Sequence, residues 1–183
     1  LYSSAASDVY KRQDEEIAEL KDEDAKSNKE GIAEEIGLIV AIDRFVMRSS
    51  MQLFKRWRDQ GKEVGVLSLN LSRRQLDQDD FFNEVSRCIS ENGFRPEWLS
   101  FEVTESSIMK NPQKAIQHLE ALSKMGISIA IDDFGTGYSS LEYLKRLPVD
   151  KLKIDRSFVR DVLVDEGDAL IIQAVIALSK SLK

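Results

Sequence analysis

Short apolar strands alternate with amphipathic helical segments along this chain, and that alternation restricts its fold more than any other feature. Strands are predicted at residues 64–70, 99–104, 127–132 and 149–155, and helices at 38–61, 79–93, 111–126, 139–148 and 158–183. Pro112 is a typical first helical residue, and Gly126 is a typical helix stop. Such alternation is characteristic of a parallel sheet with helices outside it, so the sequence predicts an α/β fold.

Each predicted strand ends on polar side chains, which helps to choose between the two architectures that fit the alternation. These residues are Asn70, then Glu102 and Glu105, then Asp132 and Asp133, then Lys153 and Asp155. A ring of polar groups from successive strands is typical of the C-terminal face of a (β/α)8 barrel, whereas an open sheet usually concentrates its site at one crevice. The strand ends therefore favour the barrel over the open sheet.

The polar strand ends offer only oxygen ligands together with one lysine. Carboxylate and amide oxygens are what hard cations such as Mg²⁺, Mn²⁺ or Ca²⁺ prefer. Asp132 and Asp133 cannot both face one site from a regular strand, but they can where the strand turns into the loop that starts at Phe134. Two such carboxylates suit two metals about 3.5–4 Å apart, a spacing used in phosphodiester hydrolysis, and Lys153 would stabilise charge on the phosphate.

Structural interpretations compete with this one at every position. Two aspartates before a glycine-rich loop are commonly a turn with helix-capping acids, and Asn70 fits an Asx turn. Lys153 fits a simple ion pair with Asp155 or Glu102. No strand end is specific when taken singly. The arrangement over four consecutive strands is specific.

Composition excludes several classes of function. A net charge of −6 argues against a surface for DNA or RNA. The single Cys88 leaves no internal disulfide and fits a reducing, cytoplasmic compartment, and the single His118 excludes chemistry that needs two imidazoles. No apolar run approaches the roughly 18 residues that cross a bilayer.

The first 30 residues differ from the remainder. Residues 3–13 resemble the conceptual translation of a transposon-end adapter used in sequencing libraries, so residues 1–13 are expected to be non-native. Residues 14–30 are highly charged and are expected to be a divergent, solvated segment.

Four sequence blocks resemble the signature blocks of the EAL domain, a family of bacterial phosphodiesterases that hydrolyse the second messenger cyclic di-GMP to linear pGpG. The blocks are NLSxxQ from Asn70, EVTES from Glu102, DDFGTGYSSL from Asp132 and LPVDxLKID from Leu147. The resemblance implies a modified TIM barrel and Mg²⁺ or Mn²⁺ as cofactor.

Carried over position by position, the resemblance implies a role for each matching residue. Asn70, Glu102, Asp132 and Asp133 would hold metal, and Lys153 would position or activate the attacking water. Glu105 would anchor the loop formed by Phe134, Gly135, Thr136 and Gly137, which in the family links metal occupancy to substrate binding and dimerisation. Ser72, Gln75 and Asp155 would lie around the substrate or behind the metal ligands.

The chain also departs from the family pattern. The Glu-Ala-Leu motif expected near Arg12 is absent, and so is the late EGVE block. A complete barrel takes roughly 250 residues. Residues 31–183 are therefore expected to be the central part of an EAL domain, truncated at both ends. The incomplete (β/α)8 barrel would leave four core strands.

Three functions remain open at this stage. The first is a cyclic di-GMP phosphodiesterase in the parent protein. That parent would form homodimers and carry GGDEF or sensory domains. Any tethering of the parent to a membrane would come from domains outside this chain. The second is a catalytically degenerate EAL domain that senses cyclic di-GMP or binds a protein. The third is an unrelated metal-dependent barrel lyase of the enolase or aldolase type, which suits Lys153 but leaves the other blocks unexplained.

We predict that purified residues 14–183 hydrolyse little or no cyclic di-GMP and aggregate readily, because an incomplete barrel exposes sheet edges and apolar helix faces. Chromatography of the reaction products and light scattering would measure both properties. Robust metal-dependent hydrolysis by this fragment would contradict the prediction.

Overall fold

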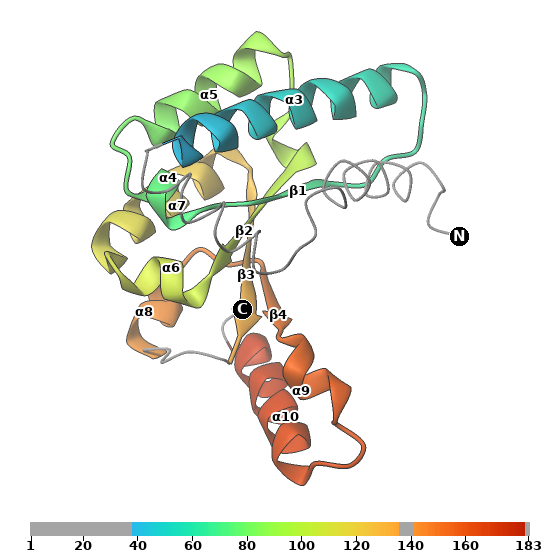
Figure 1. Cartoon of the computed structure of the whole chain (residues 1–183), viewed down its shortest axis with the longest axis vertical. Coiled ribbons are helices and arrows are strands. Elements are labelled where there is room, and N and C mark those ends of the chain that lie inside the picture. Colours follow the sequence, from blue (N-terminus) through green and yellow to red (C-terminus); the bar gives the residue numbers. More distant parts are fainter. Residues whose placement is uncertain (1–37, 136–140, 182–183) are drawn as a thin grey trace.

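The computed structural model describes residues 38–135 and 141–181, which form a parallel sheet with helices around it (Figure 1). The strands are β1 (Leu67–Asn70), β2 (Leu99–Thr104), β3 (Ser128–Phe134) and β4 (Lys151–Ile154). The helices are α3 (Ile39–Asp59), α4 (Arg73–Leu76), α5 (Phe81–Glu91), a 3₁₀ turn (Pro96–Trp98), α6 (Glu105–Met109), α7 (Pro112–Met125), α8 (Leu141–Arg146), α9 (Arg156–Arg160) and α10 (Glu166–Ser181).

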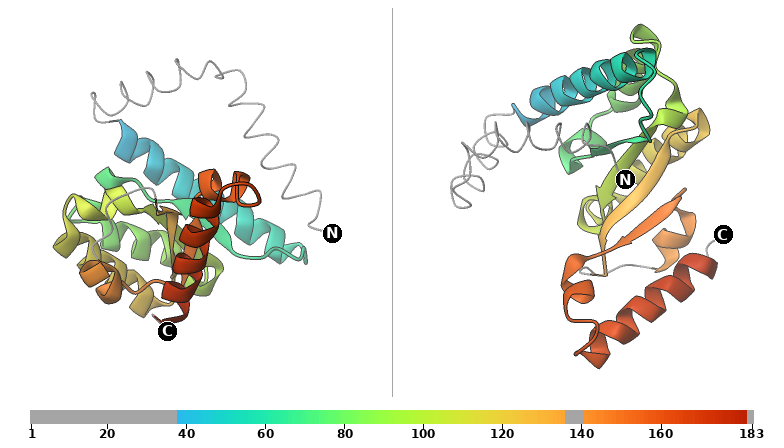
Figure 2. Two further views of the ribbon diagram at one scale, coloured as in Figure 1. Left: turned by 90° about the horizontal axis from the view of Figure 1, so that it is seen from below. Right: turned by 90° about the vertical axis from the view of Figure 1, so that its right-hand side faces the viewer.

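The four strands lie in the order in which they occur in the sequence, β1-β2-β3-β4, and each adjacent pair is parallel. A doubly wound open sheet reverses its strand order at a switch point, and these four strands contain no reversal. Sequential parallel order is the arrangement of a barrel segment. Helices α3 and α5 lie at one end of the molecule, and α9 and α10 lie at the other, beyond β4 (Figures 1 and 2).

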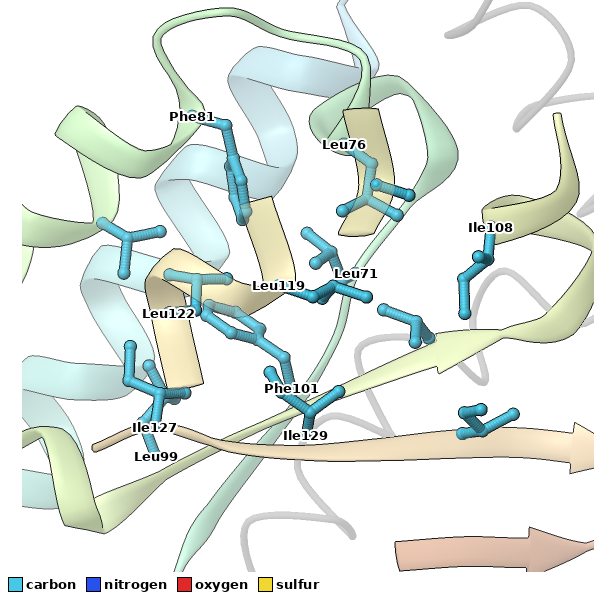
Figure 3. Close-up of a cluster of buried hydrophobic side chains, with 14 of the residues drawn as sticks. Leu71, Leu76, Phe81, Leu99, Phe101, Ile108, Leu119, Leu122, Ile127 and Ile129 are labelled. Atoms are coloured by element: carbon cyan, nitrogen blue, oxygen red, sulfur yellow. The ribbon is translucent and has the colours of Figure 1, made fainter. Parts of the chain in front are cut away.

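The core lies between the central strands and the helices α5 and α7 (Figure 3). Phe101 of β2 and Ile129 of β3 meet Leu119 and Leu122 of α7, and all four are almost completely buried. Strand β1 is different, because its residues alternate between partly buried and exposed. The sheet is therefore packed most tightly at β2 and β3, the strands that supply most of the acidic side chains described below.

Helix α7 begins and ends where its sequence signals predict. Pro112 is its first residue, where the missing N–H costs no hydrogen bond, and Gly126 follows its last residue with φ 98°. Side chains other than glycine rarely adopt that left-handed conformation. The helix prediction for residues 111–126 is confirmed.

Some boundaries differ from the prediction. β1 starts at Leu67 instead of Val64, and the side chain of Arg58 donates to the carbonyl oxygens of Val64 and Gly65 at 3.1 and 3.2 Å. Those two carbonyls are thus bonded outside the strand ladder. The side chain of Asp80, the residue before α5, makes no capping bond and instead accepts two 2.8 Å hydrogen bonds from Arg44 of α3.

Within the described residues, no helix is both long enough and apolar enough to cross a membrane.

We predict that Leu119→Ala lowers the free energy of unfolding by about 3 kcal/mol in a protein carrying the complete domain, because a fully buried leucine leaves a cavity in the core. Leu163→Ala is the matched control, since Leu163 is 95% exposed and its loss should cost less than about 0.5 kcal/mol. Urea unfolding followed by tryptophan fluorescence measures both. An equal decrease in the free energy of unfolding in both variants would contradict this description of the core.

Candidate metal and phosphodiester site

Parallel pairing brings polar side chains from all four strands to one edge of the sheet. Asn70 at the end of β1 pairs with Glu102 of β2, and Asp132 of β3 pairs with Thr104, two residues further along β2. Lys153 of β4 completes the set. Its Nζ lies 2.7 Å from Glu102 Oε2 and 2.9 Å from Asp132 Oδ2. Residues separated by more than 80 positions in the sequence thus meet at one edge.

The contact between Glu102 and Lys153 passes over β3, because β2 and β4 lie on opposite sides of that strand. Adjacent strands are about 4.8 Å apart, so only two long side chains can meet across an intervening strand. The β3 residue paired with Glu102 is Ala130, whose small side chain is buried and leaves room for this contact. Sequence reasoning missed Ala130, since an alanine in an apolar strand carries no signal of its own.

The backbone conformation of Asp133 allows the side chains of Asp132 and Asp133 to lie at the same edge of the sheet. The φ of Asp133 is +51°, the only positive φ of a non-glycine residue in the described part of the chain. The pairing of β3 with β4 shifts register between Ile131 and Phe134, which is a bulge-like irregularity. Regular strand geometry would turn neighbouring side chains to opposite faces. The left-handed residue at the end of β3 removes that alternation, as expected for a strand that turns at this point.

The electrostatics of the site are those of crowded carboxylates. The pKa of Asp133 is raised, first by burial and then by the negative charges of Asp132 and Asp155. Asp155 accepts hydrogen bonds from the Ser157 hydroxyl and, at 2.6 Å, from the Ser157 backbone N–H, which caps α9, and these two bonds lower the pKa of Asp155. Asp133 and Asp155 also share a hydrogen bond. The edge therefore carries more negative charge than its lysine can balance.

Lys153 is the one cation that contacts Glu102 and Asp132 among the described residues. Burial alone would lower the pKa of Lys153, but its hydrogen bonds to the two carboxylates raise the pKa above its ordinary value. Its ammonium group lies between Glu102 and Asp132 and is the cation that these two carboxylates share in this structure.

The donor set fits a hard divalent cation in its chemistry. Asn70, Glu102, Asp132 and Asp133 offer amide and carboxylate oxygens only. Within the described residues, no three His, Cys, Asp or Glu side chains are already gathered as a metal site. Glu102 and Asp132 are each bound to the Lys153 ammonium group in this structure.

Glu105 lies next to the site at the start of α6 and is 4% exposed. Neither of its carboxylate oxygens has a hydrogen-bond partner in the part of the chain that the structure describes. Phe134 is buried, and Gly135 has φ 102° with the Phe158 ring so close that a Cβ there would lie 3.1 Å from it. Any other residue at position 135 would be strained by this backbone conformation and would crowd the Phe158 ring. Thr136 and Gly137 lie outside the described residues, and with them the expected link to Glu105.

Ser72 and Gln75 form a capping box at the start of α4, immediately after β1. The Ser72 backbone N–H donates to Gln75 Oε1 at 3.1 Å, and the Gln75 N–H donates to Ser72 Oγ at 3.3 Å. Gln75 is buried, so in this structure it supports the turn after Asn70. Ser72 Oγ also donates to Asp43 of α3 at 2.7 Å, a contact that sequence reasoning missed.

Comparison with known proteins identifies the family. The sequence profile of the EAL domain matches residues 30–183. This chain belongs to the EAL domain family.

Relatives of known name support the assignment. The chain is 41% identical over 151 residues to the bifunctional diguanylate cyclase/cyclic di-GMP phosphodiesterase MucR of Pseudomonas aeruginosa, a match that covers 82% of the chain and 22% of MucR. It is 39% identical over 152 residues to the cyclic di-GMP phosphodiesterase NbdA of the same organism, covering 83% of the chain and 19% of NbdA. The chain therefore spans about a fifth of the length of these curated relatives.

A solved structure confirms the fold class. The structure described as PaMucR phosphodiesterase, c-di-GMP complex, superposes with a TM-score of 0.77 at 41% identity, covering 83% of this chain and 62% of that one. The prediction of an EAL-type, TIM-barrel-like α/β fold is thus confirmed. EAL phosphodiesterases depend on divalent metal ions, which agrees with the oxygen-rich donor set of this EAL domain.

We predict that Lys153→Met lowers the free energy of unfolding of the metal-free EAL domain by about 1 kcal/mol at pH 7, because Glu102 and Asp132 lose their shared cation. The effect is modest since the Lys153 side chain is 43% exposed. The folded state raises the pKa of Lys153, so this contribution is present below the unfolded-state value of about 10.4 and is lost as the pH rises past it.

The matched control is Lys151→Met, which removes an exposed lysine from the same strand. Urea unfolding of the two variants with a chelator present measures the difference. If both substitutions lower the free energy of unfolding equally, the ion pairs of Lys153 do not stabilise the fold more than an exposed lysine does.

Proposed function

We propose that the protein containing this EAL domain is a cyclic di-GMP phosphodiesterase that hydrolyses its substrate to pGpG with Mg²⁺ or Mn²⁺. The observation that carries the proposal is the convergence of Glu102, Asp132 and Lys153, from three different strands, beside Asn70. The relatives named as cyclic di-GMP phosphodiesterases supply the substrate class. Because the chain spans only part of those relatives, the activity is proposed for the complete protein.

In this proposal Asn70, Glu102, Asp132 and Asp133 hold the metal ions. When bound, the metals supply Lewis-acid chemistry that lowers the pKa of water and polarises the phosphate. Metal binding would draw the carboxylates away from Lys153. The freed ammonium group would then lie beside the reacting phosphate, where it orients the attacking water and offsets the negative charge that develops in the transition state.

The residues around the metal ligands have supporting roles in the proposal. Asp155 shares its hydrogen bond with Asp133 and so restrains that carboxylate. Glu105 would anchor the loop of Phe134, Gly135, Thr136 and Gly137, and this loop would respond to metal and substrate. The buried carboxylate of Glu105, which lacks a hydrogen-bond partner among the described residues, suits such an anchor.

The wider context of the chain is also a proposal. MucR is named as bifunctional, and this chain covers about a fifth of it, so we expect GGDEF or sensory domains elsewhere in the protein. A homodimer formed through the EAL domain would place two sites in one particle. We propose a cytoplasmic location for the domain, because its proposed substrate is a bacterial second messenger.

The test is hydrolysis by the complete protein. With cyclic di-GMP and Mn²⁺ or Mg²⁺, the wild type should form pGpG, and a chelator should abolish its formation. Asp132→Asn should reduce turnover by at least about 100-fold, since changing even the partners of metal ligands costs 10–100-fold. Chromatographic separation of cyclic di-GMP from pGpG measures the rate.

Asp59→Asn is the control, because Asp59 lies at the end of α3, is exposed and is paired with Lys55. Its turnover should equal that of the wild type. Tight binding of cyclic di-GMP by the complete wild-type protein without any pGpG would overturn the phosphodiesterase proposal and identify a sensor. Unchanged turnover in Asp132→Asn would overturn the metal assignment.

A further inference from the structure

Asp43 occupies an unexpected position on helix α3. Met47, Met51 and Phe54 form the buried face of that helix, and Asp43 continues the same face one turn before Met47. Residues at spacings of three and four lie on one side of a helix, so the pattern calls for an apolar side chain at position 43. A carboxylate there is partly buried and loses hydration, so a compensating interaction is expected.

The compensating interaction is with the turn that follows β1. Ser72 Oγ donates to Asp43 Oδ2 at 2.7 Å, across 29 positions of sequence. The same hydroxyl also lies 3.3 Å from Gln75 Oε1, but it has a single proton. The shorter bond, to a charged acceptor, is the stronger of the two, so the proton belongs to the Asp43 contact.

That turn needs an external support. Helix α4 has only four residues, so it contributes few hydrogen bonds of its own. Asn70 precedes the turn, and the next residue, Leu71, is tied to β2 through its N–H, which donates to the Glu102 carbonyl at 2.8 Å. The backbone at Asn70 is thus fixed on the side of β2 by Leu71 and on the side of α3 by Ser72.

Helix α3 is itself held firmly, so Asp43 is a fixed acceptor. Arg44 makes two 2.8 Å hydrogen bonds to Asp80, and Arg48 lies 2.9 Å from the buried Glu84 of α5. These two contacts are one helical turn apart on both helices. They fix the orientation of α3 across the sheet, with its N-terminal end beside α4 (Figure 1).

We propose that Asp43 is a positioning residue that holds the Ser72 turn and thereby sets the Asn70 carboxamide at the metal-binding edge. This inference rests on the proposed function only for the role of Asn70. The restraint of the turn by Asp43 stands on the hydrogen bonds of the described residues. Asp43 itself touches neither metal nor substrate in this proposal.

The decisive variant is Asp43→Leu in the complete protein. Leucine suits the apolar face of α3, and the Ser72 hydroxyl then has Gln75 Oε1 as an alternative acceptor. The melting temperature should therefore stay equal or rise, while the Mn²⁺ dissociation constant increases about three- to tenfold, as expected for the loss of one charged hydrogen bond behind a ligand. If Asp43 only stabilised the fold, Asp43→Leu would lower the melting temperature and the Mn²⁺ affinity together.

Four further variants sharpen the test, including Ser72→Ala by itself. Asp43→Asn retains an acceptor oxygen and should restore most of the Mn²⁺ affinity. Asp43→Leu combined with Ser72→Ala should weaken Mn²⁺ binding no more than Ser72→Ala alone, because Ser72→Ala already removes the hydrogen bond to Asp43. Asp59→Leu, on the same helix but exposed, should leave Mn²⁺ affinity unchanged. Calorimetric titration with Mn²⁺ alone measures all of these.

Amide hydrogen exchange without metal gives a readout that does not depend on the proposed function. In Asp43→Leu, the N–H groups of residues 71–76 should exchange faster, and those of β2 and β3 should not. Amide exchange and Mn²⁺ affinity equal to those of the wild type in Asp43→Leu would overturn the proposal. An equal loss of Mn²⁺ affinity in Asp43→Asn and Asp43→Leu would also overturn it. If the wild type binds no Mn²⁺ and forms no pGpG, the proposed function fails, and the exchange rates alone decide whether Asp43 holds the turn.

Discussion

Parallel pairing in sequence order is the constraint on which the site depends. It places the C-terminal ends of β1 to β4 at one edge, so that side chains from each strand can meet there. Lys153 reaches Glu102 over Ala130 only because both side chains are long and the residue between them is small. A shift of one residue in the β2–β3 register would turn Glu102 and Asp132 to opposite faces of the sheet. The tight packing of Phe101, Ile129 and α7 opposes that shift. The core thereby keeps Glu102 and Asp132 on the same face of the sheet.

A second constraint acts at a single residue. Asp133 adopts a left-handed backbone, which costs energy for any side chain other than glycine and is tolerated best by aspartate and asparagine. The irregular pairing between β3 and β4 and the close packing of Gly135 against Phe158 hold the chain in this conformation. Strained backbone that persists at a cluster of charged groups is a common property of functional sites. Here the strained backbone allows the carboxylates of Asp132 and Asp133 to lie at the same edge of the sheet.

The sequence predicted the elements whose signals are local. Pro112 and Gly126 marked both ends of α7, and the apolar runs marked all four strands within a few residues. The polar strand ends also predicted which side chains would gather, since parallel strands end at one edge. Contacts between distant segments could not be found in this way. Asp43 and Ser72 are 29 residues apart, and the only signal was an acidic residue on an apolar helix face.

The same distinction applies to the short helices and to the loop. Helices α4 and α6, of four and five residues, are too short to show periodicity, and capping bonds of Ser72 and Thr104 define them instead. Ala130 gave no signal, because its role is to be small between two long neighbours. Tertiary context decides such features, and local propensity does not.

The charge at the edge connects stability with function. Burial and the negative charges of Asp132 and Asp155 raise the pKa of Asp133, so keeping Asp133 ionised at this edge opposes folding. Lys153 contacts Glu102 and Asp132 and so offsets part of the negative charge of the edge. A divalent ion would offset more of it and would bind the folded chain in preference to the unfolded one. An edge that is stabilised incompletely by its own lysine is therefore suited to take up an additional cation. In the proposed function, a metal ion held by Glu102 and Asp132 would compete with the ion pairs that Lys153 makes to the same two carboxylates.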